Sequence, residues 1–295
     1  MPQDRKKSLA LLHFIVFLWG FTAVLGKGIH LDAPDIVFYR MSIAAASLGL
    51  FLLFRRKTIR IGLQLLLHIL LGGILLTAHW YTFFAAIKAS NVAVTLATMS
   101  SGALFVAFIE PIFFKRRVDI IEVVLGFVVI IGLSLIFTVD PSYRKGIYLA
   151  LLSALFAASF TVYNGKLIRK TNAVVISFYQ ITLGAILTGL ALLLTRNQGD
   201  AVSIIPTLRD WMNLIILGTI CTAYAFTAGI KVMRHISPYT VALVNNLEPI
   251  YGILLALLFF GKSEFMGYRF YLGAGIILTA IVIEGRIRQP KPKSD

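Results

Sequence analysis

The sequence predicts an all-α integral membrane protein whose ten transmembrane helices form two inverted five-helix repeats around a central cavity. Three observations lead to this prediction: an apolar composition, long apolar runs between short charged clusters, and an internal repeat. Of the 295 residues, 58% are apolar and 14% are charged, whereas soluble domains carry about 25% charged residues. The alternating segments of about ten residues that mark transmembrane barrels do not occur.

The apolar runs are long enough to cross a bilayer as helices. Each has about 19–25 residues, and about 20 helical residues span roughly 30 Å of hydrocarbon. A helix also pairs its own backbone amides and carbonyls, as lipid requires. The ten expected spans are residues 8–27, 34–54, 62–87, 91–114, 119–138, 146–165, 173–195, 211–231, 238–260 and 267–286.

Lysine and arginine alternate between the two sides of these spans. The N-terminus, every second loop and the C-terminus together carry 19 of them, against 8 in the intervening loops. Cytoplasmic loops are enriched in basic residues, so we expect a multi-pass protein of the cell (inner or plasma) membrane with both termini cytoplasmic. The first run resembles a signal peptide, but it is too long and lacks a cleavage site, so we interpret it as an uncleaved span.

The net charge of +15 comes from these basic clusters, and we expect them to meet an anionic leaflet and not nucleic acid. Cys221 is the single cysteine, which excludes an internal disulfide and cysteine-ligated metal clusters. The sequence has no G-x-x-x-x-G-K-[ST] loop and no H-E-x-x-H motif. We therefore expect no cofactor, no bound metal and no catalytic residues.

An internal repeat divides the chain into two halves. Three segments of the first half match three of the second in the same order: 20–27 with 159–166, 38–40 with 178–180, and 81–88 with 224–231. Five spans per half place the second half upside down in the membrane. Inverted repeats are typical of secondary transporters that bind their substrate between the halves. We expect repeats at 1–140 and 141–288, followed by a cytoplasmic tail at 289–295.

Several motifs resemble the drug/metabolite transporter superfamily, in its EamA-like branch of ten-helix proteins. These are Trp19-Gly20-Phe21, the arginine of Phe38-Tyr39-Arg40, Glu248-Pro249, and Gly261 to Glu264 followed by Gly273. In the first half, Gly102 and Arg117 stand where the pattern has the proline and the loop glutamate. The resemblance covers nearly the whole chain. It implies a secondary carrier that needs no nucleotide. Members of the superfamily mostly export amino acids, drugs or other metabolites, and some exchange sugars or phosphorylated sugars.

Two ionisable residues lie deep within expected spans, where charges are costly and therefore candidates for function. Arg40 suits a substrate carboxylate, because its planar fork binds carboxylates with two hydrogen bonds; the alternatives are a structural ion pair or a side chain that snorkels to the interface. Glu248 lies near mid-depth in the ninth span. Burial disfavours a charged carboxylate, so it would carry a coupling proton or bind a substrate ammonium; the alternative is a structural partner of Arg40 or of the neighbouring asparagines.

Aromatic and amide side chains complete the expected lining of the cavity. Aromatic rings in membrane proteins either line cavities, where they also hold cations, or anchor helices in the interface. Amides either bind polar substrate groups or join helices. The candidates are Trp19, His79, Trp80, Tyr81, Tyr163, Tyr224, Asn164, Gln180, Asn245 and Asn246.

We therefore expect a transporter that exports or exchanges amino acids or related small metabolites by alternating access, and not an enzyme. The residues fit proton coupling through Glu248 and uncoupled facilitation equally well. Two alternatives stay open: a carrier of sugar phosphates or nucleotide sugars, which would need two or more convergent basic groups, and an exporter of drugs or toxic compounds. The expected partners are a small-molecule substrate and the lipid bilayer; the sequence does not indicate an oligomeric state.

Overall fold

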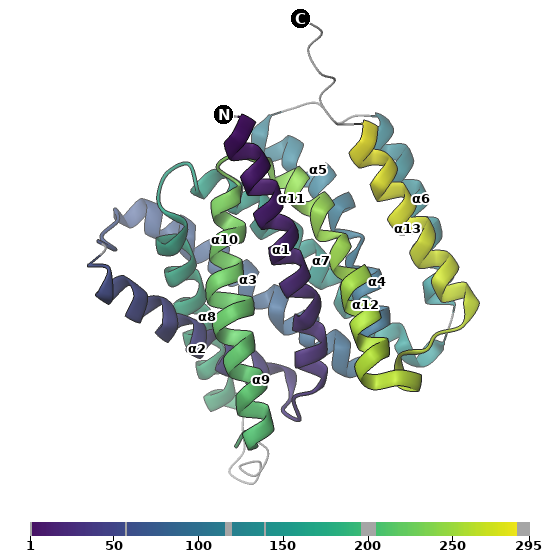
Figure 1. The fold of residues 1–295 in the computed structure, drawn as a ribbon, viewed down its shortest axis with the longest axis horizontal. Helices are drawn as coiled ribbons and strands as arrows, with labels where there is room; N and C mark the ends of the chain where they lie inside the picture. The colour runs from purple at the N-terminus through teal and green to yellow at the C-terminus, as the bar shows by residue number, and fades with distance from the viewer. Residues whose placement is uncertain (1, 57, 116–119, 139, 196–204, 288–295) are drawn as a thin grey trace, which may run out of the picture.

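The computed structural model describes residues 2–56, 58–115, 120–138, 140–195 and 205–287, and in these ranges it contains helices and no strands (Figure 1). The expected C-terminal tail at 289–295 lies outside the described residues. The helices of the first half are α1 (Pro2–Lys27), α2 (Ala33–Phe54), α3 (Leu63–Ala89), α4 (Val92–Met99), α5 (Gly102–Phe114) and α6 (Ile120–Phe137).

The second half repeats this order. Its elements are a 3-10 turn (Pro141–Tyr143), α7 (Arg144–Leu167), α8 (Ala173–Thr195), α9 (Leu208–Gly218), a π-helix (Thr219–Tyr224), α10 (Ala225–Val232), α11 (Pro238–Asn245), α12 (Leu247–Phe260), a 3-10 turn (Gly261–Glu264) and α13 (Tyr268–Ile287). In each half, one expected span is divided into two helices, α4–α5 and α11–α12.

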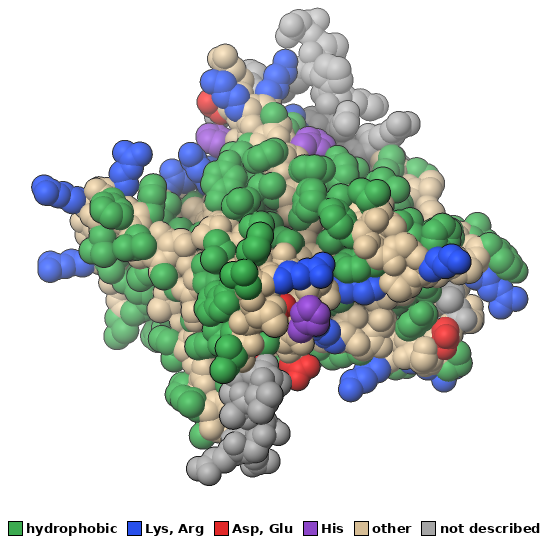
Figure 2. Space-filling view, turned by 60° about the horizontal axis from the view of Figure 1, so that its bottom comes forward, with side chains coloured by type: hydrophobic (Ala, Val, Ile, Leu, Met, Phe, Trp, Pro, Cys, Tyr) green, Lys and Arg blue, Asp and Glu red, His purple; other side chains and the backbone are tan. Residues whose placement is uncertain are grey.

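The helices have the length and surface of membrane spans. Eight stretches of the described residues are long and apolar enough to cross a bilayer, and α6 and α13, with 18 and 20 residues, correspond to the expected fifth and tenth spans. Large apolar side chains such as Phe54, Leu194 and Leu258 are exposed on the outside. Figure 2 shows apolar side chains covering much of the visible face, with Lys and Arg projecting at its margins and in a group across its middle. Such a surface is stable only against lipid.

The contacts between helices follow a pseudo-twofold pattern. Helix α3 packs along α7. Their equivalents in the other half are α9–α10 and α1, and these also pack along each other. Two pairs join equivalent helices directly: α2 with α8, and α6 with α13. This exchange of equivalent partners is what two copies of one five-helix unit in opposite orientations produce, and it confirms the architecture expected from the repeat.

Helices α6 and α13 lie side by side at one edge of the bundle (Figure 1). They cross at Gly132 and Gly273, where a Cβ added to Gly132 would lie 2.8 Å from the carbonyl oxygen of Gly273, and one added to Gly273 would lie 2.6 Å from that of Gly132. Only glycine permits backbones to approach so closely, and small residues at crossings are typical of membrane helices.

The two divided spans differ from the continuous helices expected at 91–114 and 238–260. In the first, the Ser101 hydroxyl donates to the carbonyl of Thr98 at 2.8 Å, which competes with the helical pattern between α4 and α5. In the second, Pro249 has no amide to give the carbonyl of Asn245 four residues earlier. Irregular backbone at membrane depth is tolerated where it lines a cavity, and both breaks do so.

Candidate functional site

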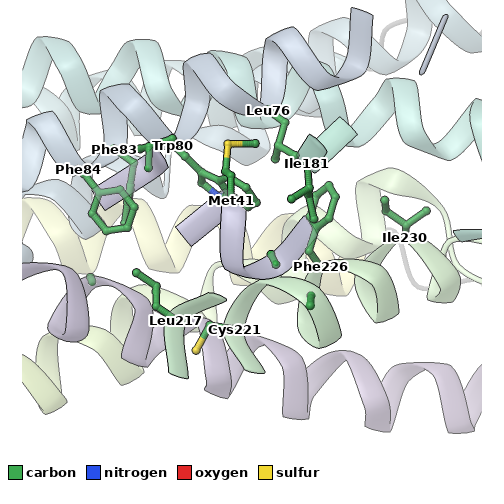
Figure 3. Close-up of a cluster of buried hydrophobic side chains, with 14 of the residues drawn as sticks. Met41, Leu76, Trp80, Phe83, Phe84, Ile181, Leu217, Cys221, Phe226 and Ile230 are labelled. Atoms are coloured by element: carbon green, nitrogen blue, oxygen red, sulfur yellow. The ribbon is translucent and has the colours of Figure 1, made fainter. Parts of the chain in front are cut away.

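A central cavity lies between the two halves, lined by residues of α1, α2, α3, α4, α5, α7, α10, α11 and α12. The volume of this cavity is about 130 Å³. On this measure a single water needs roughly 10–15 Å³, so the cavity has room for a small solute. Much of its wall is aromatic. Figure 3 shows Trp80 of α3 close to Phe226 of α10, with their ring centroids 5.7 Å apart.

Arg40 brings a positive charge to this cavity from the second turn of α2. Its side chain is only 2% exposed. The guanidinium lies over the Trp80 ring, 4.0 Å from the centroid, and its Nε donates a hydrogen bond to Thr222 Oγ1 at 2.6 Å. Its Nη1 is buried and has no hydrogen-bond partner. One edge of the guanidinium is therefore held by the protein, while its Nη groups retain donors for a ligand.

Glu248 brings a negative charge from the first turn of α12, where the positive end of the helix dipole favours a carboxylate. It is partly exposed to the cavity. It attracts Arg40 electrostatically, but within the described residues the two side chains form no salt bridge. The cavity thus presents two opposite charges that are not paired with each other.

Two amides next to Glu248 add unsatisfied polar atoms. Asn245 Oδ1 and Asn246 Nδ2 are buried without hydrogen-bond partners, and both residues line the cavity at the break between α11 and α12. A buried polar group without a partner costs about 1–3 kcal/mol. A solute that supplies one donor and one acceptor here would recover that free energy.

The sequence matches the EamA-like transporter family twice, over residues 6–138 and over residues 144–285. The chain belongs to this family. No curated protein matches the sequence. A solved structure described only as "Crystal structure of protein" is 15% identical and aligns with 97% of this chain and 100% of its own chain, with a TM-score of 0.73. That similarity concerns the fold alone.

Eight of the twelve candidate residues line the cavity of this EamA-like transporter. Six lie with the charged and aromatic groups already described: Arg40, Trp80, Glu248, Asn245, Asn246 and Trp19, whose Nε1 donates to the Cys221 carbonyl at 3.2 Å. His79 also lines the wall, but its Nδ1 lies 2.9 Å from Ser153 Oγ, which joins α3 to α7. Asn164 lines it too, paired with Gln180 behind it.

Four candidates lie outside the cavity lining. Tyr81 and Tyr224, equivalent in the two halves, are 45% and 49% exposed on the outer surface. Tyr81 follows the lining residue Trp80, and because an α-helix turns about 100° per residue its side chain points away from the cavity. Tyr163 forms a hydrogen bond of 2.6 Å with His68. Gln180 is buried behind Asn164, to which its Nε2 donates at 2.8 Å. The structure thus places these side chains away from a ligand in the cavity.

Thr222 was not among the sequence candidates, although it holds Arg40. Thr222 lies within the π-helix, just before the repeat segment 224–231, so the match with 81–88 does not reach it. No signal in the sequence distinguished it, because hydroxyl residues are frequent in these spans. The aromatic wall also includes Phe83, Phe160 and Phe226, which the sequence does not distinguish from other apolar residues of these spans.

The cavity extends unequally toward the two ends of the bundle. At the end of the bundle where α1 begins and α13 ends, the lining includes Met233, which follows the last residue of α10. It also includes Asn164, which lies in the last turn of α7. Toward the opposite end it includes no residue of α3 beyond Phe83 and none of α4 before Leu96. In this conformation the cavity therefore extends further toward the end of the bundle where α1 begins and α13 ends (Figure 1).

Proposed function

We propose that this EamA-like transporter exports or exchanges amino acids or related small metabolites through the central cavity by alternating access. The observation that supports this proposal most is the presence of Arg40 and Glu248 in one cavity without a salt bridge between them. An amino acid carries a carboxylate and an ammonium at a short separation. It would pair with both charges at once.

The two ends of such a solute meet different chemistry. The free Nη groups of Arg40 suit a carboxylate, because charge-assisted hydrogen bonds from a guanidinium are strong and directional. Glu248 and the Asn245 oxygen suit an ammonium, which is a compact donor of three hydrogen bonds. Because single charges in a low-dielectric interior are costly, binding a zwitterion satisfies both side chains without adding net charge to the cavity.

The rival substrate classes fit the lining less well. Among the described lining residues, Arg40 is the single lysine or arginine, whereas a sugar phosphate or nucleotide sugar would need more basic groups to balance its charges. A cationic drug would find aromatic rings and Glu248, but it would also face the Arg40 charge. A neutral or zwitterionic solute meets neither difficulty.

The inverted repeats support alternating access. Two related halves around one site can rock so that the site opens to either side. We propose that the termini are cytoplasmic, as the distribution of basic residues suggests, and that the conformation described faces that side. An uncoupled facilitator and a proton-coupled carrier would use the same groups, and Glu248→Gln distinguishes between them.

The experiment is counterflow in proteoliposomes preloaded with unlabelled amino acids, sugars or sugar phosphates, with entry of the matching labelled solute as the readout. We expect exchange of amino acids by the wild type and its loss in Arg40→Gln. The control is Lys231→Gln, which removes a positive charge from an exposed residue outside the cavity and should leave exchange unchanged.

Two outcomes would redirect the proposal. Exchange of a phosphorylated sugar without exchange of any amino acid would refute the amino-acid proposal and favour the anionic rival. Glu248→Gln separates the coupling modes. A variant that retains exchange but loses uptake driven by a pH gradient would identify Glu248 as the proton carrier, whereas a wild type insensitive to the gradient would be a facilitator.

A further inference from the structure

The hydrogen-bonding roles of the Thr222 hydroxyl are fixed in this structure. It donates its one hydrogen to the carbonyl of Leu217, at an oxygen–oxygen distance of 2.7 Å, and can then only accept from Arg40 Nε, 2.6 Å away. Thr222 is fully buried, so no water competes for either bond. The guanidinium is therefore bonded to a neutral acceptor. The bond from Thr222 to the Leu217 carbonyl orients the lone pair of that acceptor toward Arg40.

The π-helix accounts for this placement. Residues Thr219–Tyr224 take the wider π-turn between α9 and α10, and the Thr222 side-chain hydroxyl reaches the carbonyl of Leu217 five residues earlier. A π-turn inserts an extra residue into a helix and is common at functional sites. Just before it, a Cβ on Gly218 would lie 2.7 Å from the Ile43 side chain and 3.1 Å from the Arg40 carbonyl, so glycine permits this span to approach α2 closely.

We infer that Thr222, presented by the π-helix, is a positioning residue for Arg40: it holds the Nε edge and thereby leaves the Nη groups for a substrate carboxylate. Trp80 fixes the plane of the guanidinium from one face, and Thr222 fixes its rotation within that plane. A carboxylate partner at position 222 would instead neutralise the charge. A neutral hydroxyl orients Arg40 while leaving the charge available.

The second half lacks this arrangement. Gln180 is the repeat counterpart of Arg40, and it pairs with Asn164 through two amide hydrogen bonds of 2.8 and 3.3 Å. Only one of the two equivalent positions therefore carries a charge, and a bound solute would have a single preferred orientation.

The first test does not depend on any substrate. The full-length protein is labelled with 15N-arginine in detergent micelles, and the Nε–H signal of Arg40 is assigned by its loss in Arg40→Gln. We expect slow hydrogen exchange at this site in the wild type and in Thr222→Ser, and exchange at least tenfold faster in Thr222→Val, which removes the acceptor at nearly constant volume. The matched control is Thr219→Val, which alters the same π-helix at a hydroxyl bonded only to Ile215.

The second test rests on the proposed function and uses counterflow of L-alanine and L-phenylalanine, each with its carboxamide as competitor. We expect Thr222→Val to raise the half-saturating concentration of both amino acids by about tenfold or more, as the loss of an ordered charge-assisted bond implies. Thr222→Ser and Thr219→Val should stay near wild type. The carboxamides should compete equally in all variants, because they do not need the Arg40 charge.

The two tests fail separately. Unchanged Arg40 Nε–H exchange in Thr222→Val would overturn the inference even if amino acids are transported. If the wild type exchanges no amino acid, the proposed function is wrong, and the exchange measurement still decides whether Thr222 orients Arg40. Equal losses for amino acids and carboxamides in Thr222→Val would show a general packing defect and would also overturn the inference.

Discussion

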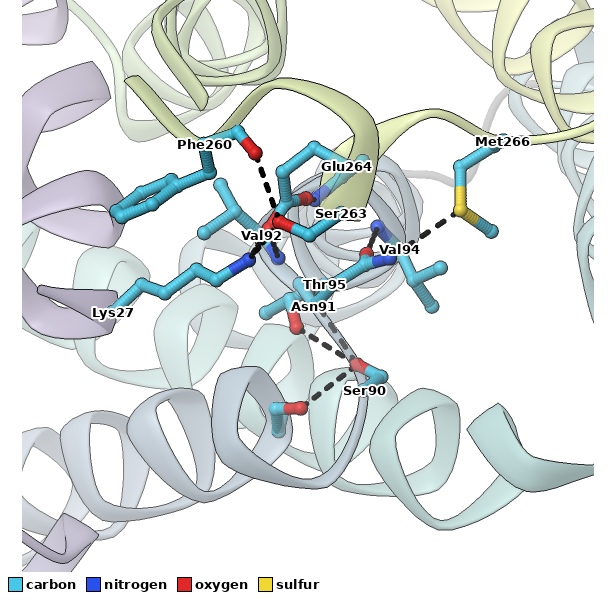
Figure 4. Close-up of polar contacts among 12 residues, drawn as sticks. Lys27, Ser90, Asn91, Val92, Val94, Thr95, Phe260, Ser263, Glu264 and Met266 are labelled. Atoms are coloured by element: carbon cyan, nitrogen blue, oxygen red, sulfur yellow. Dashed lines mark hydrogen bonds and ion pairs between the residues drawn. The ribbon is translucent and has the colours of Figure 1, made fainter. Parts of the chain in front are cut away.

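Glu264 Oε1 lies 2.5 Å from Lys27 Nζ, at the end of the bundle where α1 ends and α4 begins. Glu264 is fully buried, and its carboxylate also accepts from the amides of Val92 and Ala93 at 3.2 and 2.8 Å (Figure 4). One carboxylate thereby joins the last turn of α1, the first turn of α4 and the loop after α12. It ties the two halves together at the end toward which the cavity extends least.

Lys27→Gln should destabilise the protein by roughly 1–3 kcal/mol, because the buried Glu264 carboxylate loses its charged partner. SDS-induced unfolding in mixed micelles would measure the change in the free energy of unfolding. The matched control is Lys262→Gln, which removes a positive charge from an exposed residue of the 3-10 turn that contains Glu264 (Gly261–Glu264). Equal stabilities of the two variants would contradict a structural role for the Lys27–Glu264 pair.

Gly273→Ala should separate α6 from α13 and lower the free energy of unfolding by about 1–3 kcal/mol, the usual cost of overpacking a close contact. The reason is the position of the added Cβ, 2.6 Å from the carbonyl oxygen of Gly132. Gly275→Ala lies on the same helix, where a Cβ meets nothing within 4 Å, and should be neutral. The same unfolding assay compares them, and a neutral Gly273→Ala would refute the close crossing.

Cysteine labelling tests the proposed orientation. In a Cys221→Ser background, single cysteines at Lys115 and Lys170 should be protected from a membrane-impermeant thiol reagent in intact cells, because we expect both loops in the cytoplasm. Cysteines at Arg144 and Lys262 should react from outside. The reverse pattern would show that the bundle has the opposite orientation. Permeabilised cells supply the control that every site reacts once the reagent has access.

The membrane architecture follows from local properties of the sequence. Run length and polarity define a span without reference to its neighbours, so all ten expected spans coincide with helices or pairs of helices. The match between segments such as 38–40 and 178–180 then predicted the two related halves. Arg40 and Glu248 were identifiable because an ionisable residue within an apolar run is conspicuous wherever the helix lies.

The composition of the cavity wall was decided by the tertiary structure. Trp80 and Tyr81 are adjacent aromatic residues, yet one lies under Arg40 and the other is exposed on the outer surface. The rotation of α3 about its axis separates them, and packing against α7 and α8 sets that rotation. A hydropathy pattern does not contain this information, because a span surrounded by lipid and protein is apolar on every face.

The same reason applies to Thr222 and to the breaks beside Ser101 and Asn246. A π-turn or an interrupted helix shifts the register of the residues that follow it, and it is stable only where neighbouring helices satisfy the freed backbone groups. By itself, the sequence determined the spans, their repeat and two charged residues in the membrane. The tertiary structure alone decided which side chains share the cavity, because helix rotation and local changes of helical geometry depend on packing between segments far apart in the chain.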